Sequence, residues 1–140
     1  MIVLDTNVIS ELMRREPDPR VMAWIAGQPM AGVFTTTLTQ AEIFYGLALL
    51  PEGRRRDDLF AAARPMFEID LAGRVLPFDT DAALVYPEIA AGRRNSGKPI
   101  SQIDAQIAAI VRSRGARLAT RNVSDFADCG ITVVDPWREA

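Results

Sequence analysis

Five short apolar runs alternate with longer helical patterns along this chain, and no other feature of the sequence constrains the fold as strongly. The apolar runs cover residues 2–4, 33–37, 75–78, 117–120 and 131–134. Helical spacing of apolar side chains covers residues 8–15, 19–26, 40–50, 54–67, 81–93 and 102–114. Short strands joined by crossovers of this length form parallel pairs. We therefore expect an α/β fold, a three-layer α/β/α sandwich around a mostly parallel central sheet.

Individual residues mark the ends of several helices. Pro65 and Pro87 fall inside helical patterns, so we expect a break or a kink near each. For the helix over residues 102–114, Ser101 is the expected N-cap and Gly115 the expected stop. The apolar face of this helix is expected to comprise Ile103, Ile107, Ile110 and Val111. These signals make it the best-defined helix of the chain.

The length and the apolar content bound the number of domains. The chain has 140 residues, of which 49% are hydrophobic, and this suits one domain with a sizeable core. We expect residues 1–140 to form that single domain. The first apolar run is broken by Asp5, and no later stretch approaches the roughly 20 apolar residues that span a bilayer. We therefore expect a cytoplasmic protein with no membrane partner.

The inventory of side chains limits the chemistry that is available. The sequence has no histidine and a single cysteine, Cys129, which excludes an internal disulfide, a thiolate metal cluster and a histidine general base. The net charge of -2 gives no overall attraction to nucleic acid, so phosphate contacts must come from local arginines. Carboxylates, hydroxyls and cations remain as the groups that can carry a reaction.

Four acids lie near the ends of the predicted strands. Asp5 follows the first apolar run directly, Glu42 lies at the start of the helix after the second, and Asp125 follows the fourth. Asp104 lies in the first turn of the helix that leads into the fourth run. Because the carboxyl ends of parallel strands meet at one edge of a sheet, we expect these acids to converge there. The sequence thus predicts an acidic pocket at that edge.

A cation is the natural partner of such a pocket. Several ionised carboxylates a few ångströms apart repel one another, so either their pKa values rise or a cation joins them. Carboxylate, amide, hydroxyl and water oxygens suit Mg²⁺ or Mn²⁺ better than Zn²⁺ or Cu²⁺. Such an ion can activate water for phosphate chemistry without histidine or cysteine.

Helix capping is the alternative explanation for each acid. Capping-box spacing relates Thr39 to Glu42 and Ser101 to Asp104, a similar spacing relates Asn122 to Asp125, and Asp5 can itself cap the helix that begins near Thr6. An acid at a helix N-terminus contributes about 0.3 to 1 kcal/mol. Capping therefore accounts for each acid singly, but it does not predict that four of them gather at one end of one sheet.

Four sequence blocks together resemble a known family. They are IVLDTN at residues 2–7, TQAE at 39–42, PISQIDAQIAA at 99–109 and ATRNVSDF at 119–126. In this order, the blocks resemble PIN-domain ribonucleases, and more narrowly the toxin subunits of VapBC toxin-antitoxin pairs of the FitB-like kind. The first block alone is a weak signal, whereas the four together span nearly the whole chain.

The resemblance implies a fold, an activity and a set of partners. It implies a compact PIN-like α/β/α sandwich that acts as the toxin of a type II toxin-antitoxin system. The implied activity is endoribonuclease cleavage, dependent on Mg²⁺ and supported by Mn²⁺, of transfer RNA or other structured RNA. In that family a metal-activated water attacks phosphorus and leaves a 5′-phosphate and a 3′-hydroxyl. The implied partners are a second copy of the chain, in a homodimer, and a small DNA-binding antitoxin of the VapB or FitA kind.

The resemblance also implies roles for individual residues. Asp5 and Asp104 correspond to principal metal ligands, and Glu42 completes the acidic cluster. The fourth position is open, because Asp125 can fill it directly or act through water beside Asn122; the number of metal ions is open as well. Two hydroxyl residues, Thr6 and Thr120, are expected either to orient ligands or phosphate or to act as local caps. Two arginines, Arg121 and Arg93, are expected either to contact substrate phosphate or to face solvent, and Arg121 can alternatively pair with the acids.

Three rival interpretations fit the sequence less well or share the fold. A phosphatase of the haloacid-dehalogenase type also begins with a strand and an aspartate, but it needs a second acid where this chain has Asn7. A phospho-accepting receiver domain needs an early acid pair and a lysine after a late strand, whereas the one lysine here, Lys98, precedes a helix. The third is a catalytically inactive PIN-like binding module whose acids only cap helices.

Overall fold

The computed structural model describes residues 1–139 and contains a five-stranded sheet at its centre. The strands are β1 (Ile2–Leu4), β2 (Val33–Thr36), β3 (Val75–Leu76), β4 (Arg117–Ala119) and β5 (Thr132–Val134). Their order in the sheet is β3-β2-β1-β4-β5, and every pairing between neighbours is parallel. The prediction of a mostly parallel sheet is therefore confirmed, with the first strand in the middle.

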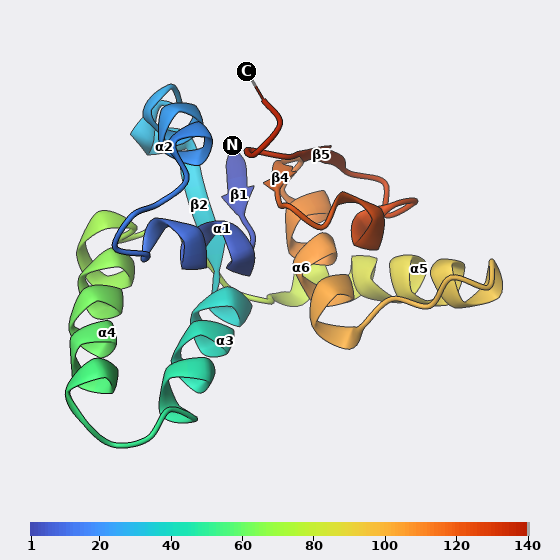
Figure 1. Cartoon of the computed structure of the whole chain (residues 1–140). Coiled ribbons are helices and arrows are strands. Elements are labelled where there is room, and N and C mark those ends of the chain that lie inside the picture. Colours follow the sequence, from blue (N-terminus) through green and yellow to red (C-terminus); the bar gives the residue numbers. More distant parts are fainter. Residues whose placement is uncertain (140) are drawn as a thin grey trace.

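Helices cover both faces of this sheet (Figure 1). The helices are α1 (Thr6–Leu12), α2 (Pro19–Ala26), α3 (Thr37–Ala48), α4 (Arg54–Pro65), α5 (Thr80–Asn95) and α6 (Gln102–Ser113), with short turns η1 (Met30–Gly32), η2 (Met66–Asp70) and η3 (Val123–Phe126). Successive side chains of β1 point to opposite faces: Val3 packs in the core under α5 and α6, whereas Ile2 and Leu4 pack in the core under α1 to α4. The α/β/α sandwich is thus confirmed, and within residues 1–139 no helix is long and apolar enough to cross a membrane.

Three local predictions have different outcomes. Helix α4 ends at Pro65 and gives way to a π-helical turn, as expected from the missing N–H of proline. Helix α5, in contrast, continues through Pro87 without a break. The placement of Ile103 on the buried face of α6 is wrong, since its side chain is 38% exposed. Ala105, and not Ile103, is the residue of the first turn of α6 that packs in the core.

The N-terminus of α6 is capped as the sequence predicts. The Oγ of Ser101 accepts a hydrogen bond from the backbone N–H of Asp104 at 3.2 Å, and Gly115 takes the left-handed conformation, with φ of 61°, just after the helix. This cap fixes the first turn, where Asp104 lies.

Replacing Ser101 by alanine is expected to lower the free energy of unfolding by about 1 kcal/mol, because one N–H of the first turn loses its partner. Urea denaturation followed by circular dichroism measures the change. The matched control is Ser124→Ala, since Ser124 is exposed and the structure gives its hydroxyl no hydrogen bond within residues 1–139. Equal stability of Ser101→Ala and the unaltered chain would contradict the assignment of the cap.

Candidate functional site

A pocket of about 530 Å³ opens at the carboxyl edge of the sheet, beyond the ends of β1 and β4. Six residues predicted from the sequence line it: Asp5, Thr6, Glu42, Asp104, Arg121 and Asn122. Five further residues complete its wall: Asn7, Ser10, Glu11, Arg14 and Trp137. Three of the four predicted acids therefore share one pocket, although they come from the junction of β1 with α1, from α3 and from α6.

Asp5 is both a helix cap and a buried wall of this pocket. Its Oδ1 accepts a hydrogen bond from the N–H of Thr6 at 2.8 Å, which caps α1, and its Oδ2 accepts one from the hydroxyl of Thr120 at 2.7 Å. The side chain is only 4% exposed. The pKa of Asp5 is raised to about 6, chiefly by burial; the charges of Asp104 and Glu42 add to the rise, and the hydrogen bonds from Thr120 and Thr6 oppose it.

Thr120 is the centre of the hydrogen bonds that hold Asp5. While its hydroxyl donates to Asp5, its Oγ1 accepts from Asn7 Nδ2 and from the backbone N–H of Asn122, each at 3.1 Å. Asn7 in turn accepts the backbone N–H of Arg121 at 3.1 Å. The hydroxyl of Thr120 is therefore directed at a carboxylate. Thr120 and Asn7 together tie the end of β1 to the end of β4.

Glu42 reaches the pocket from the second turn of α3. The helix begins at Thr37, with Thr36 as its N-cap, and not at residue 40 as the sequence pattern suggested. The capping-box interpretation of Glu42 is therefore wrong, because a residue this far into the helix has no free N–H to cap. Its Oε1 instead accepts a hydrogen bond from the hydroxyl of Thr6 at 2.6 Å.

Asp104 faces the same pocket from the first turn of α6. Burial raises its pKa, Ser101 opposes that rise, the charges of Asp125 and Glu42 add to it, and Arg93 lowers it. The electrostatic effects of Glu42 on both aspartates show that the three carboxylates influence one another across the pocket.

Asp125 stands apart from these three acids. It lies in η3, is exposed, and does not line the pocket, whereas Asn122 does. Its charge still contributes to the raised pKa of Asp104. Across residues 1–139, no three side chains among the acids and Cys129 are gathered closely enough to hold a metal ion as they stand.

The donor set of the pocket nevertheless fits a divalent cation. Asp5, Glu42 and Asp104 supply only carboxylate oxygens, and none of them forms an ion pair with an arginine of residues 1–139. The raised pKa values of Asp5 and Asp104 are what uncompensated, partly buried carboxylates give. A hard cation with oxygen preference would compensate them.

Arg121 and Trp137 form a further part of the pocket wall and contact each other. The guanidinium carbon of Arg121 lies 4.9 Å from the centre of the Trp137 ring, and the Trp137 side chain is 5% exposed. Arg121 is exposed and makes no ion pair within the part of the chain that the structure describes. Arg121 therefore rests on an aromatic face, and its N–H groups are available to a ligand.

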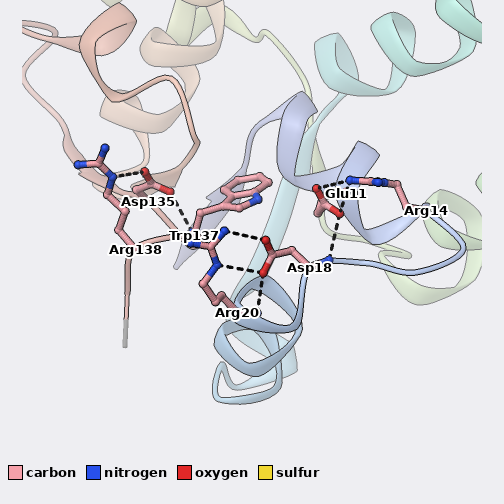
Figure 2. A network of polar contacts seen from close by, with 7 residues as sticks. All are labelled: Glu11, Arg14, Asp18, Arg20, Asp135, Trp137 and Arg138. Carbon is pink, nitrogen blue, oxygen red and sulfur yellow. Dashed lines mark hydrogen bonds and ion pairs between the residues drawn. The ribbon is translucent and has the colours of Figure 1, made fainter.

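Polar contacts fix the segments that carry the lining residues Glu11, Arg14 and Trp137 (Figure 2). The buried Glu11 accepts the N–H of Asp18 at 3.1 Å and pairs with Arg14 at 3.3 Å. Asp18 caps α2 and is held at 2.8 Å by the guanidinium of Arg20, which lowers the pKa of Asp18 to about 2. The carboxylate of Asp135 accepts a hydrogen bond from the backbone N–H of Trp137 at 2.9 Å, and this bond fixes the turn that places the indole at the pocket.

Sequence reasoning did not single out five of the lining residues. Four of them carry a detectable signal, because Asn7, Ser10, Glu11 and Arg14 are spaced at i, i+3, i+4 and i+7 and so lie on one face of the chain at α1. Trp137 carries no such signal, since its place depends on how the chain turns after β5.

Arg93 differs from both expectations stated for it. It neither lines the pocket nor faces solvent, since its side chain lies in the core with 7% exposure. Its guanidinium donates hydrogen bonds to the backbone carbonyl of Lys98, in the loop before α6, and to the carbonyls of Asp125 and Ala127, in η3 and just after it.

Comparisons with known proteins agree with this geometry. The family model described as PIN domain matches residues 2–130. The relative named VapC ribonuclease Y4jK, from Sinorhizobium fredii, is 44% identical over 140 residues, covering 100% of both chains. Toxin FitB, from Neisseria gonorrhoeae, is 36% identical over 139 residues, covering 99% of this chain and 100% of that protein. The solved structure of FitAB bound to an IR36 DNA fragment superposes with a TM-score of 0.92 at 36% identity, covering 100% of this chain and 98% of the other.

Proposed function

The chain belongs to the PIN-domain family, and from this premise we propose that it is the toxin of a type II toxin-antitoxin system and acts as a metal-dependent endoribonuclease. The observation that carries the proposal is the gathering of Asp5, Glu42 and Asp104 in one pocket without a cationic partner in residues 1–139. Relatives of matching length named VapC ribonuclease and toxin FitB support it.

We propose that Asp5, Glu42 and Asp104 hold Mg²⁺, with Mn²⁺ as a substitute. The fourth contribution comes from Asp125, either directly or through water beside Asn122, which lines the pocket where Asp125 does not. Bound there, the cation supplies the positive charge that phosphodiester hydrolysis needs in a chain without histidine.

The remaining polar residues of the pocket orient the acids and the substrate. Thr120 and Asn7 hold the Asp5 carboxylate in a fixed direction, and Thr6 does the same for Glu42. Arg121, supported by Trp137, offers its guanidinium to a phosphate of the RNA backbone. The chain thus provides fixed carboxylates on the pocket floor and a cation for the substrate on its rim.

We propose transfer RNA or another structured RNA as the substrate, a homodimer as the assembly and the cytoplasm as the location. A small DNA-binding antitoxin is the proposed inhibitor. The similarity to FitB as solved in FitAB bound to DNA, and to VapBC-1 from nontypeable Haemophilus influenzae at 26% identity and a TM-score of 0.76, supports this partner.

Incubation of the purified chain with transfer RNA is expected to give discrete fragments in the presence of Mg²⁺ or Mn²⁺ and none in excess EDTA. Fragment ends mapped by ligation should carry a 5′-phosphate and a 3′-hydroxyl. Addition of a cognate small antitoxin protein should stop the cleavage. If a folded chain binds RNA or the small protein but leaves RNA intact with either metal, the inactive binding module is the better description.

A further inference from the structure

We propose that Arg93 is a positioning residue of this site, which holds η3, and with it the backbone of Asp125, in a fixed place relative to the loop that enters α6. The inference rests on the proposed nuclease function and deepens it, because it assigns a cause to the placement of the fourth acid.

The guanidinium of Arg93 joins two segments that are distant in sequence. Its Nε donates to the carbonyl of Lys98 at 2.7 Å, and its Nη1 donates to the carbonyls of Asp125 at 2.8 Å and Ala127 at 2.9 Å. Nη1 also lies 3.6 Å from the sulfur of the buried Cys129. One side chain at the end of α5 therefore fastens both the loop that enters α6 and the turn that carries Asp125.

These two segments are the ones that bring acids to the pocket edge. Three residues after Lys98 the chain reaches Ser101, which caps α6 and fixes the turn of Asp104. Figure 1 shows the segment between β4 and β5 returning towards α5 and α6, and within it Asp125 has its backbone carbonyl held by Arg93. Arg93 thus sets the separation between the two acids through their backbones.

The burial of Arg93 is unusual for a residue that serves packing alone. Its side chain is 7% exposed, yet it forms no ion pair with a carboxylate within residues 1–139. A buried charge without a paired opposite charge is costly, and an apolar side chain of similar volume would fill the same space without that cost. What the apolar side chain could not do is bind three carbonyls at once in the fixed geometry of the guanidinium fork.

The Asp125 side chain itself makes no polar contact within the described residues that would fix its position. It is exposed, it lies outside the pocket lining, and the structure gives its carboxylate no hydrogen bond or ion pair within residues 1–139. The backbone contact to Arg93 is therefore the contact that fixes the place of the turn that carries this exposed acid.

Arg93→Met is expected to lower kcat for RNA cleavage about 10- to 100-fold and to change KM by less than about twofold. This is the size of effect typical of residues that orient a metal ligand without contacting the metal. Because Arg93 acts through Asp125, the same substitution should change kcat by less than about threefold when Asp125 is already asparagine. The matched control is Arg94→Met, since the neighbouring Arg94 is exposed and makes no side-chain hydrogen bond or ion pair in residues 1–139, and it should keep the original kcat.

Arg93→Lys keeps the charge and most of the volume, but an ammonium group cannot bind three carbonyls in the geometry of the guanidinium fork. It should therefore lower kcat about 3- to 10-fold when Asp125 is present, and much less when Asp125 is already asparagine. This variant decides the question if Arg93→Met fails to fold. Equal losses in both backgrounds would overturn the inference, because a merely structural role lowers kcat regardless of Asp125. A wild-type chain that does not cleave RNA would refute the proposed function itself, whereas active wild type with unaffected Arg93 variants refutes only this inference.

Discussion

Replacement of Asp104 by asparagine is expected to lower the rate of RNA cleavage by at least about 10³-fold, equivalent to about 4 kcal/mol of lost transition-state stabilisation. Asp104 is one of three carboxylates that share the pocket, and its charge is coupled to those of Glu42 and Asp125. Asparagine keeps the shape of the side chain but removes the negative charge that a divalent cation requires. The cap of α6 survives, since it uses the backbone N–H of residue 104. Cleavage of labelled transfer RNA at saturating Mg²⁺ measures the loss.

A folded but inactive Asp104→Asn protein is the outcome that distinguishes catalysis from capping. Circular dichroism should show the unaltered fold, and thermal unfolding in EDTA should show no loss of stability, because burial already raises the pKa of Asp104 and a neutral side chain avoids the cost of the buried charge. The control is Asp58→Asn, because Asp58 is an exposed acid on α4, far along the chain from the pocket, and should retain full activity. Undiminished cleavage by Asp104→Asn would refute the catalytic role of the pocket.

The architecture of the sheet was predictable because its central strand, β1, is short, apolar and buried on both faces. Val3 and its neighbours in β1 contact two different cores, and such strands are nearly continuous runs of apolar residues in any parallel sheet. Exact helix ends were less predictable. The side chain of Thr36 caps α3, although the sequence pattern that follows Thr39 resembles the N-terminus of a helix equally well.

The convergence of Asp5, Glu42 and Asp104 was predictable for a related reason, since a parallel sheet places the carboxyl ends of all its strands at one edge. The contributions of Trp137 and Arg93 were not. Trp137 reaches the pocket only through the turn after β5, and Arg93 lies in the last turn of a helix, where an arginine usually faces solvent. Both depend on tertiary contacts between segments that share no local pattern.

In metal-free buffer near pH 8, Asp5→Asn is expected to stabilise the chain by about 2 kcal/mol. The native pKa of Asp5 is raised from 3.8 to about 6, so ionising this carboxyl costs the native state about 3 kcal/mol relative to the unfolded chain. Asparagine removes that cost and keeps the cap of α1 through its side-chain oxygen. The hydrogen bond with the hydroxyl of Thr120 becomes weaker, which destabilises the variant by about 1 kcal/mol. Urea denaturation in EDTA measures the difference.

The pH dependence of this gain follows from the direction of the shift. Above about pH 6 the carboxyl of Asp5 is ionised in both states and the native state bears the full cost, so the advantage of asparagine is greatest there. As the pH falls from 6 towards 4, the native carboxyl takes up its proton first and the advantage shrinks. Millimolar Mg²⁺ at pH 8 should stabilise the unaltered chain and not the variant, which narrows the gap.

Asp18→Asn is the matched control for Asp5→Asn, because both acids are N-caps but their pKa values are shifted in opposite directions. Arg20 holds the Asp18 carboxylate and lowers its pKa to about 2, so ionised Asp18 favours the native state above pH 4 and Asp18→Asn should be slightly less stable at pH 8. If Asp5→Asn were also less stable than the unaltered chain in EDTA, capping would outweigh burial at Asp5. A carboxylate that lowers the stability of the metal-free fold is, in contrast, what a residue retained for cation binding should show.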